Sequence, residues 1–152
     1  MAITFFLNGP FSQFAPARFD LEGQSFCSAE QYMMWSKAML FGDQAMADKI
    51  LASRYSHDHQ ALGRRVSPFD PARWDAVARD VVARGNLAKF QADPDLAAAL
   101  RETGTTRLAY ASPDPRWGIG VTEENPRAQD PEAWPGENWL GLALEQVRAA
   151  LG

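Results

Sequence analysis

The sequence predicts a mostly helical α+β protein that forms a single domain over residues 1–152. Helix-start signals predict the helical part, because Ser28, Asp70-Pro71 and Asp93-Pro94 each place a capping side chain before an apolar periodic stretch. Only a few short apolar runs are typical of strands. A chain of 152 residues with 46% hydrophobic residues has the length and composition of one globular domain.

The N-terminal segment is expected to form a strand and then a helix. Residues 3–7 (Ile-Thr-Phe-Phe-Leu) predict a short buried strand, and Asn8-Gly9-Pro10 supplies the turn that follows it. Ser28 is predicted to cap a helix that ends near Leu40, because Gln31 stands three residues later at the capping-box position.

Three further helices are predicted from the same kinds of signal. They are expected over residues 43–53, 70–92 and 93–104. Gly42 and Gly104 are placed where glycine commonly ends a helix. Gly85 lies inside the longest of the three and is expected to be its weak point.

The C-terminal part is expected to contain two short strands and a last helix. The strands are predicted over residues 107–112 and 118–121, and the amphipathic helix over residues 138–151. The stretch between Thr122 and Gly136 holds three prolines and four acids, so we expect either a functional lid or a disordered insert there.

Charge and cysteine content exclude several classes of protein. The formal net charge of −4 argues against a general nucleic-acid coat protein, although a local arginine cluster could still bind a phosphate. Cys27 is the only cysteine, which excludes an internal disulfide and metal sites built on paired thiolates. The N-terminus has no basic region and only a short apolar run, so we expect a cytoplasmic protein and no contact with a membrane.

An acid and an amine share one face of the helix predicted over residues 28–40. Glu30 and Lys37 are about 700° of helix apart, so their side chains fall within about 20° of each other, with Met33 and Met34 between them. Burial would raise the pKa of the carboxyl and lower that of the amine, as a general acid and a nucleophile require. Alternatively, the two charges flank a core stripe and reach solvent.

A second candidate group lies in a proline-rich loop. Asp114 stands between two prolines and is followed by Trp117, so a rigid loop could present a carboxylate to a ribose hydroxyl and an indole to a base. The alternative is an ordinary Asp-Pro turn with the tryptophan in the core.

Arginine and histidine pairs form the remaining candidates. Arg64 and Arg65 follow Gly63 and suit bidentate contacts with a phosphate, unless they only end a solvated helix. His57 and His59 are two residues apart on a probable helix and therefore point to different faces, so no metal site is expected.

Taken in order, these segments resemble the NADAR (YbiA-like) family. The resemblance extends from about Ile3 to Leu151. The matching segments are Phe11-Ser12-Gln13-Phe14, Glu30-Gln31-Tyr32-Met33-Met34, Lys37-Ala38, Phe41-Gly42-Asp43, Leu62-Gly63-Arg64, Trp74, Lys89-Phe90, Leu100, Thr103-Gly104, Ser112-Pro113-Asp114, Trp117-Gly118-Ile119-Gly120, Asn138 and Leu140-Gly141.

The resemblance implies hydrolysis of an N-glycosidic bond without a metal or redox cofactor. Family members act on phosphoribosylamino-pyrimidine intermediates of riboflavin biosynthesis or remove ADP-ribose from guanine bases, so the implied partner is a small nucleotide or a modified nucleic acid. Lys37 matches the family lysine thought to attack the sugar C1′ as a Schiff-base nucleophile, and Glu30 and Asp114 match acids around the ribose. The residues expected to contact the substrate are Asn8, Ser12, Phe14, Arg64, Tyr110, Trp117 and Gly118.

Tyr110 departs from the family pattern, because many relatives carry a glutamate there. Its phenol would offer a stacking face in place of a charge, which implies a shifted substrate or a slower enzyme. The alternative function is a non-catalytic module that binds ADP-ribose or a nucleotide, although such a module needs no lysine directed at C1′. A structural or interaction role has only the acidic loop at residues 122–136 in its favour.

Overall fold

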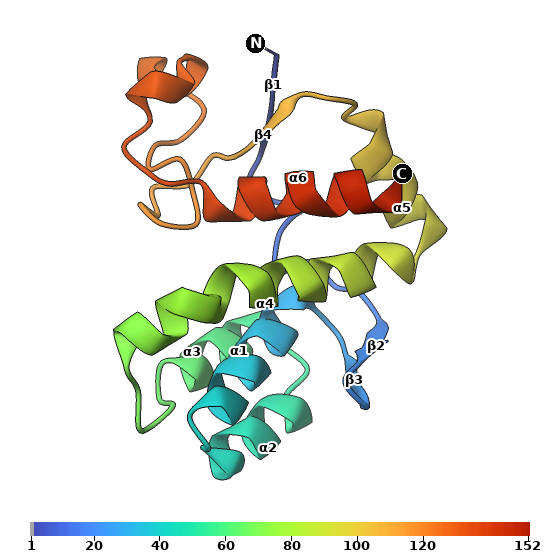
Figure 1. Ribbon diagram of the computed structural model, residues 1–152, viewed down its shortest axis with the longest axis vertical. Coiled ribbons are helices and arrows are strands. Elements are labelled where there is room, and N and C mark those ends of the chain that lie inside the picture. The colour runs from blue at the N-terminus through green and yellow to red at the C-terminus, as the bar shows by residue number, and fades with distance from the viewer. Residues whose placement is uncertain (1) are drawn as a thin grey trace.

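Two helices cross the middle of the molecule side by side, and the other elements lie on either side of this pair (Figure 1). They are α4 (Pro71–Gln91) and α6 (Trp139–Leu151). The computed structural model describes residues 2–152. Its other elements are β1 (Ile3–Phe6), β2 (Phe19–Leu21), β3 (Gln24–Phe26), α1 (Ala29–Leu40), α2 (Gln44–Ala52), α3 (Ser56–Gly63), α5 (Pro94–Glu102), β4 (Arg107–Tyr110) and the 3₁₀ helices η1 (Pro126–Gln129) and η2 (Pro131–Ala133). The predicted mostly helical α+β class is confirmed.

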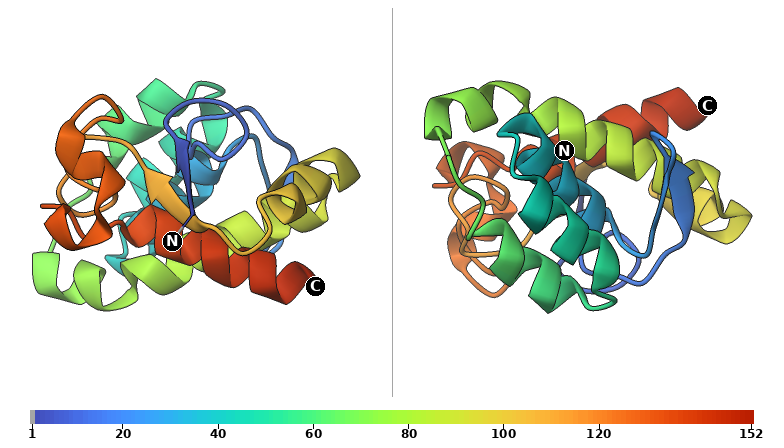
Figure 2. Two further views of the ribbon diagram at one scale, coloured as in Figure 1. Left: turned by 90° about the horizontal axis from the view of Figure 1, so that it is seen from above. Right: turned by 90° about the horizontal axis from the view of Figure 1, so that it is seen from below.

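The two sides of the molecule differ in secondary structure. Strands β1 and β4 pair in parallel next to α6, whereas α1, α2 and α3 form the opposite side, as the views from above and below show (Figure 2). No helix in the described chain is both long enough and apolar enough to cross a bilayer.

Side-chain caps fix the starts of most helices where the sequence predicts them. The hydroxyl of Ser28 accepts from the backbone N–H of Gln31, and Asp43, Asp70 and Asp93 accept in the same way at the starts of α2, α4 and α5. The Gln31 side chain differs from a capping box in one detail. Its Oε1 accepts from the N–H of Cys27, at 2.7 Å, instead of from Ser28.

The glycine inside α4 is a packing position. A Cβ added at Gly85 would lie 2.5 Å from Cδ2 of Tyr32, so only glycine lets the ring of this α1 residue rest against α4. Gly85 is therefore required for the contact between α1 and α4. The expectation from helix propensity, that Gly85 weakens the helix, did not include this packing role.

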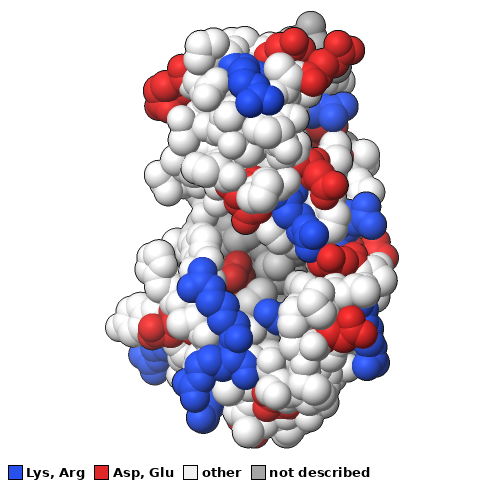
Figure 3. Space-filling view, turned by 90° about the vertical axis from the view of Figure 1, so that its left-hand side faces the viewer, with Lys and Arg blue, Asp and Glu red and all other residues white. Residues whose placement is uncertain are grey.

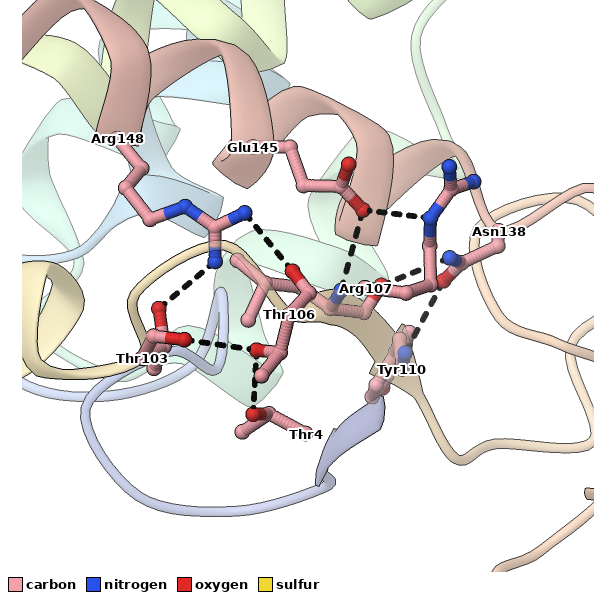
Figure 4. Close-up of polar contacts among 9 residues, drawn as sticks. Thr4, Thr103, Thr106, Arg107, Tyr110, Asn138, Glu145 and Arg148 are labelled. Carbon is pink, nitrogen blue, oxygen red and sulfur yellow. Dashed lines mark hydrogen bonds and ion pairs between the residues drawn. The ribbon is translucent and has the colours of Figure 1, made fainter. Parts of the chain in front are cut away.

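Side chains of α6 and of Asn138, the residue that precedes it, form hydrogen bonds with the backbone groups along the free edge of β4 (Figure 4). Asn138 Nδ2 donates to the carbonyl oxygen of Leu108 at 2.8 Å, and its Oδ1 accepts from the N–H of Tyr110 at 3.0 Å. A carboxylate oxygen of Glu145 accepts from the N–H of Leu108, and Arg148 donates to the carbonyl oxygen of Thr106. An unpaired strand edge would leave these groups without partners, so the helix takes the place of a third strand.

Two predictions for the C-terminal part were wrong. Residues 118–121 form no strand, because Gly118 stands in a tight turn and Ile119 and Gly120 donate singly to Tyr110 and Ser112 without building a ladder. The segment over residues 122–136 is neither structureless nor a lid. It contains η1 and η2, packs buried Ala128 with Ile119, and contributes nothing to the wall of the cavity described below.

The hairpin of β2 and β3 was not predicted from the sequence. These strands pair antiparallel and are joined by Glu22 and Gly23, whose φ angles of 54° and 78° are both positive. This is the conformation of a two-residue hairpin turn. The available signal was the Glu22-Gly23 pair between the short segments Phe19–Leu21 and Gln24–Phe26, each of which carries a buried phenylalanine.

We expect the amide of Asn138 to contribute strongly to stability. Asn138→Gly keeps the positive φ of 54° accessible but leaves a buried carbonyl and a buried N–H on β4 unpaired, so it should lower the free energy of unfolding by roughly 2–4 kcal/mol. Asn138→Ala should cost about 1 kcal/mol more because alanine disfavours that backbone conformation. Urea unfolding measures both, with exposed Gln146→Ala as the control; a glycine variant as stable as wild type would contradict the role of the amide.

Candidate active site

A cavity of about 260 Å³ opens where α1, α3 and α4 meet the loops that follow β1 and β4. Figure 3 shows this face of the molecule hollowed, with acidic atoms inside the hollow and Lys and Arg side chains along its lower rim. The lining residues are Gln13, Phe14, Glu30, Met33, Met34, Lys37, Gln60, Arg64, Trp74, Tyr110, Asp114, Trp117 and Leu140.

Helix α1 contributes four residues of one face to the cavity. These are Glu30, Met33, Met34 and Lys37, and the spacing of three to four residues per turn brings them together as the sequence suggests. The helix is buried over residues 29–35, so the carboxyl of Glu30 can meet water or a ligand only through the cavity.

The carboxyl of Glu30 is nearly enclosed. The residue is 6% exposed, and burial raises its pKa from 4.5 to about 7, while the positive charges of Lys37 and Arg64 oppose this rise only in part. Among the described residues, none forms a hydrogen bond or an ion pair with the carboxyl group of Glu30. A carboxyl with a pKa near 7 can both release and accept a proton at neutral pH.

The amine of Lys37 lies further along the same face and is half-buried. Desolvation lowers its pKa, and the charge of Arg64 acts in the same direction, while Glu30 raises it. Its Nζ lies 4.5 Å from the centroid of the Phe69 ring and forms no ion pair with a described carboxylate. Lys37 therefore loses its proton more readily than a surface lysine and is free to approach a ligand.

Backbone hydrogen bonds hold Asp114 rigidly in its loop. One carboxylate oxygen accepts from the N–H groups of Arg116 and Trp117, at 2.8 and 3.0 Å, which leaves the other oxygen for a ligand. Gly118 packs under this turn, since a Cβ there would lie 2.8 Å from the carbonyl oxygen of Ser112. The loop thus presents a carboxylate and the half-buried Trp117 to the cavity together.

The cavity also has a cationic rim and aromatic walls. Arg64, which follows α3, is exposed and forms no ion pair with a described residue. Tyr110 stacks on Phe6 with 5.4 Å between ring centroids, and burial raises its pKa, so its phenol is neutral at pH 7. Phe14 stacks on exposed His57 with ring centroids 5.5 Å apart.

Three residues expected at the substrate lie outside the cavity wall. Asn8 and Ser12 line a separate, more open depression beside it, and the hydroxyl of Ser12 accepts from the N–H of Phe14. Gly118 is buried in the turn described above. Conversely, the cavity is also lined by four residues that were not proposed from the sequence, namely Gln13, Gln60, Trp74 and Leu140. Of these, Gln13, Trp74 and Leu140 belong to the segments that carry the family resemblance.

The two histidines of α3 lie apart, as their spacing predicts. His59 is fully buried and its Nε2 lies 2.8 Å from the carbonyl oxygen of Ser53, whereas His57 is exposed on Phe14.

The fold and the cavity define a small α+β protein with a buried acid, a perturbed lysine and a cationic rim around one ligand-sized cavity. The NADAR domain matches residues 5–152, and the chain belongs to the NADAR family.

Known relatives agree with this assignment. The chain is 43% identical to N-glycosidase R617 of Acanthamoeba polyphaga mimivirus, over 91% of this chain and 85% of that protein. It is 28% identical to N-glycosidase Npun_R5314 of Nostoc punctiforme, over 92% and 83%. It is 38% identical to protein irg-1 of Caenorhabditis elegans, over 83% of this chain and 61% of that protein. The solution structure of Escherichia coli YbiA superposes with a TM-score of 0.80 at 25% identity, over 99% of this chain and 84% of YbiA.

Glu30 should make stability depend on pH in a defined direction. Because its folded pKa of about 7 lies above its ordinary 4.5, the native state loses stability as pH rises from 4.5 to 7. Glu30→Gln removes this loss. The free energy of unfolding of the variant, relative to that of the wild type, should therefore increase across that pH range by roughly 3 kcal/mol in total. Thermal and urea unfolding between pH 4.5 and 8 measure the gain. Exposed Glu123→Gln is the control, and a gain for Glu30→Gln that does not change with pH would contradict the burial of an ionisable carboxyl.

Proposed function

We propose that this protein is an N-glycosidase that hydrolyses the bond between the ribose and the nitrogen base of a phosphorylated N-riboside. The class follows from membership in a family with two relatives named N-glycosidases. The observation that carries the proposal is that Glu30 and Lys37 face one cavity with pKa values shifted toward each other.

The two groups together can move a proton and form a bond. An ammonium on Lys37 passes its proton to ionised Glu30, and the neutral amine attacks C1′ of the ribose. The C1′–N bond breaks, and the departing base takes the proton from Glu30. A proton then moves from the substituted amine of Lys37 to the ring oxygen as the C1′–O bond breaks, which opens the sugar ring and gives a protonated imine on Lys37. Water adds to the imine carbon, and the C1′–N bond to Lys37 breaks to release the sugar as an aldehyde and restore the amine.

The remaining cavity groups fit charge development and substrate binding. The free carboxylate oxygen of Asp114 can stabilise the positive charge that develops at the sugar as the bond breaks. Arg64 at the rim suits a phosphate, since guanidinium groups bind phosphate in bidentate geometry. Trp117 and the neutral ring of Tyr110 offer faces on which a base can stack.

Two substrate classes fit this description: ADP-ribosylated guanine, free or in nucleic acid, and the phosphoribosylamino-pyrimidine intermediates of riboflavin biosynthesis. Incubation of the protein with each, followed by identification of the released base by mass, distinguishes them. Tyr110 is the cavity residue that we expect to bias this choice, because it places a neutral ring where a carboxylate would carry charge.

The alternative is a module that binds ADP-ribose or a nucleotide without cleaving it. The aromatic walls formed by Phe14, Trp74, Tyr110 and Trp117 favour binding of a base in either case. Catalysis is the better interpretation because stacking alone leaves the enclosed carboxyl and the perturbed amine without a role.

Borohydride added during turnover should trap the sugar on Lys37. The chain has three lysines, Lys37, Lys49 and Lys89, so peptide mass mapping locates the adduct directly. Lys37→Ala should abolish trapping and turnover with an unchanged circular dichroism spectrum, whereas Lys49→Ala, which changes an exposed residue of α2, should behave as wild type. Full activity of Lys37→Ala would replace the imine mechanism with attack by water. Ligand binding without turnover by the wild type on both substrate classes would favour the binding module.

Arg64→Ala should weaken recognition of the phosphate. We expect KM for a phosphorylated substrate to rise by the equivalent of ~1.5–3 kcal/mol, the usual contribution of a hydrogen bond to a charged group, with little change for the dephosphorylated analogue. Arg65→Ala is the matched control, because Arg65 is also exposed but does not line the cavity. Equal losses on both substrates would assign Arg64 a structural role.

A further inference from the structure

Gln13 is the polar cavity residue that the mechanism above does not use. It lies in the loop between β1 and β2, is 9% exposed, and lines the cavity next to Glu30. Its backbone carbonyl accepts from the N–H of Glu30 at 2.9 Å, so the two residues are fixed relative to each other.

Hydrogen bonds to α4 determine which way the Gln13 amide points. Fully buried Asn86 donates from Nδ2 to the carbonyl oxygen of Val82 at 2.9 Å, and this bond identifies the Asn86 nitrogen. The same nitrogen lies 2.7 Å from the side-chain oxygen of Gln13. The opposite orientation of Gln13 would bring two N–H groups together, so Gln13 must present Oε1 to Asn86 and turn Nε2 toward the cavity.

The Nε2 group of Gln13 has hydrogen-bonding capacity to spare. Its only partner among the described residues is the thioether sulfur of Met33, a weak acceptor 3.8 Å away. An amide nitrogen carries two N–H donors, so at least one is free for a ligand. A donor in an otherwise enclosed position gains most from a partner, because an unsatisfied buried polar group is costly.

Lys89 holds the backbone of this loop in place. The residue is 1% exposed, and its Nζ donates to the carbonyl oxygens of Pro10 and Ser12, at 2.7 and 3.1 Å. Together with Asn86 it attaches the loop to α4, so Gln13 is preorganised and does not need to be ordered by the ligand.

We infer that Gln13 is a specificity-determining residue whose Nε2 donates a hydrogen bond to the 2-hydroxyl of a ribose bound in the cavity. This inference rests on the proposed function, which brings C1′ to Lys37; in the proposed pose the adjacent 2-hydroxyl is directed toward Glu30 and Gln13. A hydroxyl that accepts from Gln13 keeps its own proton for a carboxylate oxygen of Glu30. A sugar without this hydroxyl leaves both groups unpaired, and such sites reject the analogue strongly. The protein should therefore prefer ribosides to 2-deoxyribosides.

Binding of two closed-ring probes tests this inference without turnover. The probes are methyl ribofuranoside 5-phosphate and its 2-deoxy counterpart, which cannot open to an aldehyde and react with Lys37. Calorimetry on the wild type should show at least about tenfold tighter binding of the ribo probe. Gln13→Met, which has similar length but no donor, should reduce this preference to within about twofold by weakening the ribo probe alone. Gln13→Leu, which has neither a donor nor an acceptor, should lose the preference as well, and this second variant decides the matter if Gln13→Met fails to fold.

The outcomes separate this inference from the proposed reaction. Three outcomes would overturn the role of Gln13. A folded Gln13 variant could still prefer the ribo probe, the wild type could bind both probes equally, or the wild type could bind neither. Hydrolysis of N-ribosides by a wild type without a hydroxyl preference would leave the N-glycosidase intact. A hydroxyl preference lost in both variants, with no turnover by the wild type, would keep the role of Gln13 and remove the reaction.

Discussion

The burial of the first two turns of α1 is the constraint on which the rest of the structure depends. Residues 28–35 are all buried, so this segment has no face directed at bulk solvent. A carboxyl on such a helix must be paired, neutralised or opened to a cavity, because an isolated buried charge is very costly. Glu30 is both opened to the cavity and partly neutralised, because its pKa rises until the neutral form is well populated near pH 7. The chemistry of the site is thus a direct consequence of how α1 is packed.

The neighbours of α1 are adapted to this enclosure. Gly85 of α4 admits the ring of Tyr32, and Gly63 of α3 admits Met34, so two helices approach α1 at positions where a Cβ would collide. The side chain of Gln31 serves the backbone on both sides: it accepts from the N–H of Cys27 and donates to the carbonyl oxygen of Ile50. The backbone groups next to Gln31 are therefore satisfied locally, whereas the carboxyl of Glu30 faces the cavity and the buried hydroxyl of Ser36 forms no hydrogen bond with a described residue.

Local signals in the sequence were sufficient for five of the helices and for one face of the site, but not for contacts between distant segments. The bounds of α3, which has no side-chain cap, and of the 3₁₀ helices η1 and η2 were not predicted. The caps at Ser28 and Asp70 depend on neighbouring backbone N–H groups, and the alignment of Glu30 with Lys37 depends only on helical period. The strand predicted over residues 118–121 failed because a short apolar run does not reveal whether a partner strand lies alongside it. The position of Gln13 in the cavity depends on Asn86 and Lys89 of α4, more than 70 residues away, and no local pattern encodes that contact.

The two cations of the cavity differ in a way that matches separate tasks. Arg64 is exposed at the rim, and its guanidinium group suits bidentate contacts with a phosphate. Lys37 is half-buried and has a lowered pKa, so it can lose its charge and act as a nucleophile. Because Glu30 is partly neutral near pH 7, these cations are not fully balanced by the acids of the cavity. The site can therefore be locally positive in a chain of net charge −4, and surface charges further than about 8 Å away are largely screened at physiological salt. The acidic composition of the whole chain and an affinity for a phosphorylated ligand are thus compatible, because they act over different distances.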